Sequence, residues 1–214
     1  MTCRSRGRNR ILGAIPIIGR NDSSYQYNYI YALDASLIEE AASLAAGFNG
    51  AINPLTLQFD LNKAIQIAND QHMTTQAQLD KTVISQTIQV DNMVGKIMQA
   101  ISQELNATFP EGQIANQLTL AMTNVFTNLN MQDSSAWIFW KDEGAHSTTY
   151  LYNMLFAIQS GDIPDCIGCF PMGFEISVDI EKEKVLFITI KDEHTYSVRV
   201  TAIKAIQNSC FPFN

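Results

Sequence analysis

The order of hydrophobic and polar positions divides the chain into a helix-rich first part and a strand-rich last part. Aromatic residues alternate with other residues over positions 25–33, and this period of two predicts a strand. Apolar residues then recur every three or four positions over 36–48, and again from Asp60 to Ala68, which predicts two helices. Ser36 and Glu39 have the spacing of a capping box at the start of the first helix.

Residues 76–105 also have their apolar residues at helical spacing, and a further helix is expected after Pro110, with apolar positions from Ile114 to Leu129. Positions 82–90 are rich in β-branched side chains, which favour extended backbone, so helix and strand both stay open there. The first 130 residues are therefore expected to be mostly helical.

After position 170 the pattern changes to strict alternation. Positions 174–181 and 196–201 alternate apolar and polar residues, which predicts two strands with one buried face each. Between them, 185–190 is uniformly apolar and predicts a central strand, with short polar hairpin connections at 179–184 and 192–195. Helices followed by an antiparallel meander indicate an α+β domain with helices packed on a sheet.

The charge distribution sets the first 24 residues apart from the rest of the chain. Five arginines occur within the first 20 residues; removing them from the 14 basic residues leaves nine against 21 acidic ones, a net charge of −12. An acidic body of this kind argues against nucleic acid as a partner. The length and the apolar content of 46% suit one folded domain. The sequence contains no run of 18 apolar residues, so we expect no membrane-spanning helix.

Candidate chemistry is sparse. His72, His146 and His194 fall in polar connections without metal-ligand spacing, and Cys166 and Cys169 form a single Cys-x-x-Cys without a second pair. Four cysteines leave a reduced interior and an intermolecular disulfide both open. No nucleophile elbow, phosphate loop or dinucleotide fingerprint occurs, so we expect no enzyme, no catalytic or metal site and no cofactor.

Several ordered sequence blocks resemble the Cyt cytolytic delta-endotoxins. Both tryptophans lie in one of them, Ala136-Trp-Ile-Phe-Trp140, between Phe126-Thr-Asn-Leu-Asn130 and Tyr152-Asn-Met-Leu-Phe-Ala-Ile-Gln159. Further blocks occupy 46–55, 64–69, 173–175 and 184–192. The resemblance runs from about residue 28 to about residue 203.

This resemblance implies a single three-layer domain in which helical hairpins pack around a central, mainly antiparallel β-sheet. It also implies an insecticidal cytolysin that is stored in a parasporal crystal or released from the bacterial cell and acts extracellularly. The expected partners are membrane phospholipids, zwitterionic ones above all, and further copies of the chain on the membrane, with no protein receptor. We expect a basic tail at 1–24 that proteolysis removes, a toxin domain at 25–207 and a C-terminal tail at 208–214.

Insertion of β-strands is the expected way into the bilayer, because backbone groups in hydrocarbon must be hydrogen-bonded internally. Segments 147–159, 172–180 and 184–191 approach the length that spans it, and we expect the covering helices, including the 36–48 helix, to detach first. Alternating strands are also typical of an ordinary core, and a non-lytic lipid-binding or carbohydrate-binding module is the alternative function. Arg10 and Arg20 are the expected sites of activating proteolysis. The residues expected to contact membrane are Trp137, Trp140, Tyr150, Tyr152, Phe156, Phe174, Ile176, Val178, Leu186 and Ile188.

Overall fold

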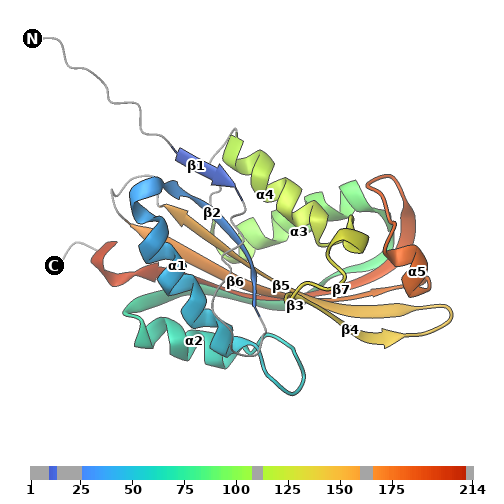
Figure 1. Ribbon diagram of the computed structural model, residues 1–214, viewed down its shortest axis with the longest axis horizontal. Helices are drawn as coiled ribbons and strands as arrows, with labels where there is room; N and C mark the ends of the chain where they lie inside the picture. Colours follow the sequence, from blue (N-terminus) through green and yellow to red (C-terminus); the bar gives the residue numbers. More distant parts are fainter. Residues whose placement is uncertain (1–9, 14–25, 108–112, 160–165, 211–214) are drawn as a thin grey trace, which may run out of the picture.

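A mixed β-sheet forms the middle layer of the fold (Figure 1). The computed structural model describes residues 10–13, 26–107, 113–159 and 166–210. Within them, seven strands follow the order β1-β2-β5-β6-β7-β3, with β4 paired to β5. All pairs are antiparallel except β2 with β5. The strands are β1 (Arg10–Gly13), β2 (Asn28–Asp34), β3 (Met73–Gln89), β4 (Ile138–Glu143), β5 (Thr148–Gln159), β6 (Ile167–Val178) and β7 (Glu193–Gln207).

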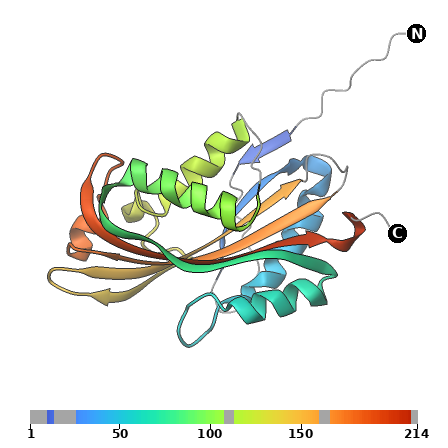
Figure 2. The ribbon, with the colours of Figure 1, turned by 180° about the vertical axis from the view of Figure 1, so that it is seen from behind.

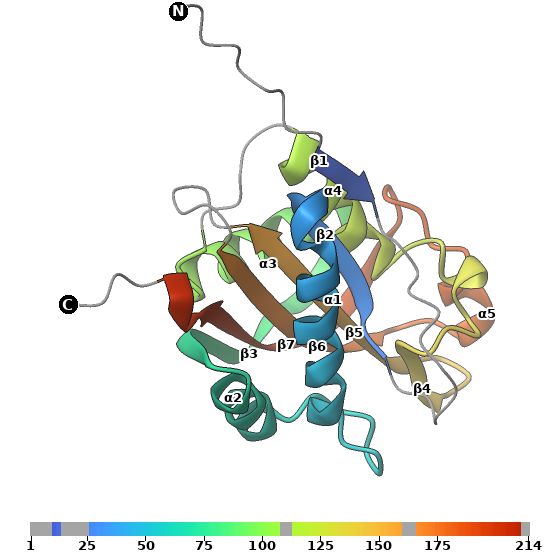
Figure 3. The same cartoon turned by 60° about the vertical axis from the view of Figure 1, so that its left-hand side comes forward.

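Helices cover both faces of this sheet (Figures 1 and 3). On one face lie α1 (Ile38–Gly47) and α2 (Leu61–Asp70), which bury small alanine side chains against the strands. On the other lie α3 (Val90–Glu104) and α4 (Gln113–Asn124), which bury larger apolar side chains. Figure 2 shows α3 lying across the sheet from behind. The α+β class and the three-layer arrangement predicted from the sequence are confirmed.

Strands β5 and β6 form the centre of the sheet, and both of their faces are buried over most of their length. One face of the two strands borders the apolar core beneath α3 and α4, and the opposite face borders a separate core beneath α1 and α2. The even-numbered positions point to the first core and the odd-numbered ones to the second, as pleated backbone requires.

The helix expected over 76–81 is wrong, because these residues belong to the 17-residue edge strand β3, and the alternative left open for 82–90 is decided as strand up to Gln89. The helix expected beyond them is α3. A register shift between Thr82 and Ile84 marks a bulge in its pairing with β7. The extra residue places Leu79, Ile84 and Ile88 on the same face although five and then four positions separate them. Buried positions four or five residues apart resemble the periodicity of a helix, whereas the β-branched side chains of 82–90 correctly indicated a strand up to Gln89.

The expected central strand over 185–190 is also wrong. The short helix α5 (Lys182–Val185) and the turn after it fold over the core beneath α3 and α4, burying Val185 and Ile188. Strand β6 pairs directly with β7, so 179–192 is a long connection between two neighbouring strands. A short apolar run cannot distinguish a buried strand from a buried turn by its pattern.

The starts of the first two helices follow different rules. Asp60 caps α2 by accepting a hydrogen bond from the Lys63 backbone N–H at 2.9 Å, as its position predicted. The capping box of Ser36 and Glu39 is absent, because a turn of 3-10 helix (Ala35–Leu37) precedes α1 and leaves no side-chain cap.

A disulfide joins Cys166 to Cys210, across a sequence separation of 44. It connects the residue before β6 to the short 3-10 helix (Asn208–Cys210) that follows β7. The bond is intramolecular, which replaces both cysteine alternatives left open by the sequence. Cys169 is a buried free thiol on β6, and burial raises its pKa to about 12.

Candidate functional site

Six of the residues expected to contact membrane form two adjacent rows on one face of the sheet. Tyr150, Tyr152 and Phe156 lie on β5, and each is at most 1% exposed. Their neighbours on β6 come into register, with Tyr150 opposite Ile176 and Tyr152 opposite Phe174. Phe174, Ile176 and Val178 are at most 2% exposed. We call these six side chains the strand band.

Strand β7 extends this apolar surface by a third row, whose residues were not among the expected membrane contacts. Val198 pairs with Ile176, Val200 with Phe174, and all are buried in the same core. The alternation of positions 196–201 was the available signal. The oily surface therefore covers three neighbouring strands.

The other four expected residues surround the strand band but belong to different elements. Trp137 and Trp140 are partly buried against its core from the β4 side, and the Trp140 ring lies 5.3 Å from that of Tyr150, centroid to centroid. Leu186 and Ile188 pack against the same core from the turn after α5. The structure thus brings all ten residues to one apolar core, although Trp137, Leu186 and Ile188 are not on a strand.

The α3–α4 layer covers the strand band. Its buried side chains interlock with the rows of β5, β6 and β7 in one continuous apolar core. These side chains are Val90, Met93, Val94, Ile97, Ile101, Leu118, Ala121 and Met122. Helix α1, by contrast, packs on the opposite face, so its position does not control access to the strand band.

Hydrogen bonds join the aromatic residues to the segment that follows α4. The buried hydroxyl of Tyr150 donates to the carbonyl oxygen of Val125 at 3.0 Å, and that of Tyr152 donates to Gln132 Oε1 at 2.9 Å. The Trp137 indole N–H donates to the same oxygen at 3.2 Å. Trp140 Nε1 donates to Asp133 Oδ1 at 2.6 Å. We call residues 125–133 the anchoring segment, because it holds the end of α4 to the sheet.

Burial keeps the two tyrosine hydroxyls of the band uncharged. It raises the pKa of Tyr150 well above the usual value, with the neighbouring Tyr196 adding to the shift. Burial also raises the pKa of Tyr152. The band therefore stays neutral in moderately alkaline solution, and no ionised group opposes its transfer into an apolar phase.

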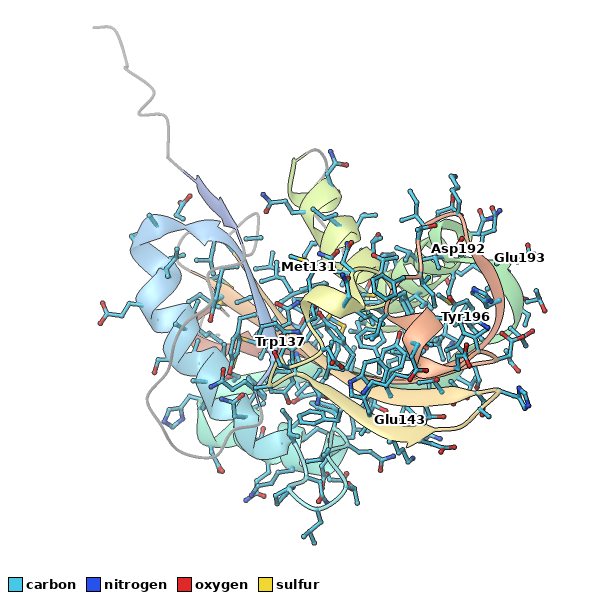
Figure 4. All side chains as sticks on the ribbon, turned by 45° about the vertical axis from the view of Figure 1, so that its right-hand side comes forward. Met131, Trp137, Glu143, Asp192, Glu193 and Tyr196 are labelled. Atoms are coloured by element: carbon cyan, nitrogen blue, oxygen red, sulfur yellow. A yellow bond between two sulfur atoms is a disulfide. The ribbon has the colours of Figure 1, made fainter. Side chains whose placement is uncertain are left out.

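Exposed apolar side chains mark the surface beside this layer. Met131 is 82% exposed at the end of a 3-10 helix (Leu129–Met131), and Phe187 is 68% exposed just after α5. The Asn130 N–H donates to the Leu186 carbonyl oxygen at 3.1 Å, so the two segments adjoin. In Figure 4, Met131 lies above Trp137.

One of the two expected cleavage sites lies at the other end of the sheet. Arg10 begins β1, which pairs with the edge of β2 and also contacts α4. Arg20 lies outside the described residues. Among the described residues no helix has the length and apolar content to cross a bilayer, and no three His, Cys, Asp or Glu side chains of that part of the chain converge as metal ligands do.

Comparison with known proteins identifies relatives over most of the chain. The type-2Aa cytolytic delta-endotoxin of Bacillus thuringiensis subsp. kyushuensis is 38% identical over 182 residues, which are 85% of this chain and 70% of the relative. The type-2Ba toxin of subsp. israelensis is also 38% identical, over 85% of this chain and 69% of the relative.

The fold agrees with solved structures of such toxins. The activated Cyt2Ba monomer from subsp. israelensis superposes with a TM-score of 0.81 at 35% identity, over 89% of this chain and all of that one. A second delta-endotoxin structure gives the same TM-score and identity over 96% of this chain and 91% of its own. The family model for the Bacillus thuringiensis toxin matches residues 13–210. The chain therefore belongs to the Bacillus thuringiensis toxin family, among the cytolytic delta-endotoxins.

Proposed function

We propose that this protein is a cytolytic toxin that permeabilises lipid bilayers from outside the target cell. The observation that supports the proposal best is the strand band together with the row that β7 adds to it, an in-register apolar surface beneath a separate helical layer. The names of the relatives, which are cytolytic delta-endotoxins, support the same activity.

The strands are long enough for the task. A tilted strand of about 9 to 11 residues crosses the hydrocarbon of a bilayer, and β5, β6 and β7 have 12, 12 and 15 residues. Release of the α3–α4 layer exposes the strand band while the hydrogen-bond ladders between β5, β6 and β7 stay intact. Backbone groups then remain satisfied in an apolar surrounding.

Two exposed apolar residues make the first contact with lipid: Met131, within the anchoring segment, and Phe187, in the neighbouring turn after α5. The lysines nearby are neutralised: Lys182 pairs with Glu143 at 3.1 Å, Lys184 with Glu181 at 3.0 Å, and Lys191 with an aspartate. A surface with balanced charge favours zwitterionic phospholipids over anionic ones. No protein receptor is needed for contact of this kind.

Proteolysis acts at the opposite edge. A cut after Arg20 separates residues 1–20, including β1, from the rest of the domain. Removal of β1 frees the backbone edge of β2 and takes away a neighbour of α4. A free edge can pair with another chain, which gives oligomers on the membrane a route to form.

Cross-linking tests which helical layer must move. Lys81 on β3 forms an ion pair with Glu104 on α3. In the double variant Lys81→Cys, Glu104→Cys, a short bismaleimide can therefore cross-link α3 to β3. Cys3→Ser is added to this variant to remove a competing thiol. We expect the cross-linked protein to bind phosphatidylcholine vesicles without releasing a trapped dye, whereas each single variant releases it normally.

A matched cross-link serves as the control on the opposite face. Gln207 on β7 donates to Glu40 on α1 at 2.6 Å, so Glu40→Cys with Gln207→Cys fixes α1 instead. We expect this protein to keep its dye release. Full release after α3 is fixed to β3 would disprove detachment of the α3–α4 layer, and no release by the unmodified, protease-trimmed protein would refute cytolysis itself.

A further inference from the structure

A polar cleft of about 440 Å³ opens on the sheet face opposite the strand band. The loop that precedes α2, with Gln58, Phe59 and Asp60, forms one wall. The sheet forms the floor and the far wall through odd-numbered positions of β5, β6 and β7 together with Asp80 of β3. None of its polar residues takes part in the mechanism proposed above.

A glycine makes room for an aromatic wall. A Cβ atom at Gly173 would lie 2.4 Å from the Cβ of Phe59, closer than real contacts permit. Because position 173 has no side chain, the Phe59 side chain rests directly on the sheet, where its ring also meets that of Tyr27 edge to face at 6.4 Å. Phe59 is 9% exposed, so it gives the cleft a narrow apolar edge that is held in a fixed position.

Carboxylates on the sheet supply hydrogen-bond acceptors held in fixed positions. Arg199 donates to both oxygens of Asp80, Nε to Oδ1 and Nη2 to Oδ2, each at 3.0 Å, and Thr201 donates to Oδ1 at 2.9 Å. Glu175 accepts from Gln58 Nε2 at 3.3 Å and from Lys141. Each carboxylate oxygen can accept more than one hydrogen bond, so both groups keep capacity for a ligand.

An amide in the floor of the cleft lacks a partner. The Asn153 side chain is 1% exposed and lines the cleft, and its Nδ2 has no hydrogen-bond partner among the described residues. Leaving a buried donor unpaired is unfavourable. The Nδ2 atom is itself buried, so a ligand oxygen in the cleft becomes its acceptor when the Asn153 side chain turns toward the cleft. This observation is independent of the carboxylates.

The charge of the lining selects the ligand class. Asp60, Asp80 and Glu175 stand against Arg199, so the lining is acidic and disfavours phosphate or other anions. We propose that the cleft binds a neutral sugar ring, whose apolar face lies against the exposed edge of Phe59 while its hydroxyls donate to Asp80 and Glu175 and accept from Asn153. The proposal does not depend on the lytic mechanism, because the cleft lies on the other face of the sheet.

Saturation-transfer NMR of the full chain tests the proposal. The probes are the methyl glycosides of glucose, galactose, mannose and N-acetylglucosamine, each at ~10 mM, and phosphocholine as a lipid-headgroup probe; the expected Kd for a single sugar ring is on the order of 1 mM. We expect signal from at least one sugar and none from phosphocholine. Absence of signal from all four sugars, or signal from phosphocholine alone, would overturn the proposal.

Two variants locate the binding. Asn153→Leu replaces an unpaired amide by an apolar group of similar size, so the thermal midpoint should not fall while sugar affinity drops at least tenfold. Asn69→Leu, on the exposed side of α2 outside the cleft, is the matched control and should bind as the parent does. Unchanged affinity in Asn153→Leu would contradict the site.

The source of the sugar is a separate question that vesicles answer. We expect phosphatidylcholine vesicles with 10% of a glycolipid bearing the preferred sugar to bind the parent protein more tightly than pure phosphatidylcholine vesicles do, with the gain lost in Asn153→Leu. Dye release from pure phosphatidylcholine vesicles should be equal in both proteins. Failure of sugar binding with intact dye release would refute the cleft alone, whereas sugar binding without dye release would refute cytolysis alone.

Discussion

The hydroxyl of Tyr150, in the middle layer, donates to the backbone carbonyl oxygen of Val125, the residue that follows α4, across 3.0 Å in a buried setting. This bond joins the strand band directly to the end of the helical layer that covers it. It is satisfied only while the two layers are packed together, so it stabilises the closed form and must break when the α3–α4 layer leaves.

Removing this bond should destabilise the closed form. In Tyr150→Phe the ring still fills the core, but the Val125 carbonyl loses its donor, and we expect about 1 to 2 kcal/mol less free energy of unfolding in urea. Dye release from phosphatidylcholine vesicles should become faster. Slower release at lower stability would argue that Tyr150 acts in the membrane-bound form instead.

The exposed ring of Phe187 should matter for binding rather than for folding. Phe187→Ser removes apolar surface that is 68% exposed, so the thermal midpoint should barely change while the vesicle partition constant falls several-fold. Leu55→Ser is the matched control, since Leu55 is 91% exposed in the loop before α2. Equal losses in both variants would remove the special role of Phe187.

The disulfide should stabilise the end of the sheet. Cys166 and Cys210 close a loop with a sequence separation of 44, for which loop-closure entropy gives about 4 kcal/mol. The variant Cys166→Ser, Cys210→Ser should unfold at correspondingly lower urea concentration. Reducing agent should lower the stability of the parent but not of the variant; sensitivity of both would indicate another cause.

Acid should weaken the wall of the cleft. Hydrogen bonds from Arg199 hold the pKa of Asp80 below its usual value of 3.8. The folded pKa is lower than the unfolded one, so this pair stabilises the fold above about pH 4, and the contribution disappears as pH falls through the folded pKa. Between pH 5 and 2 the thermal midpoint should therefore fall more in the parent than in Asp80→Asn. The difference should be small, since the Asp80 side chain is 38% exposed.

Local sequence patterns predicted correctly those elements in which the buried positions keep a regular spacing. The alternation predicted the parts of β6 and β7 that pair with each other, 174–178 and 196–200, although the expected strand continued to 181 and β6 ends at Val178. Asp60 marked the start of α2 correctly. The same patterns failed at β3, where a bulge against β7 changes the phase of the buried positions. A bulge arises in the pairing of two strands, so the sequence of one strand alone does not show where it occurs.

The sequence by itself determined the chemistry of the strand band: six apolar or aromatic side chains at alternate positions of two segments. Only the tertiary structure decided that α3 and α4 cover them, that β7 extends them, and that the 185–190 run is a turn beside them. It alone brought Asn153, Gly173 and Phe59 together in a cleft. The physical reason is that alternation fixes which side of a strand is apolar, whereas long-range packing decides what lies against that side.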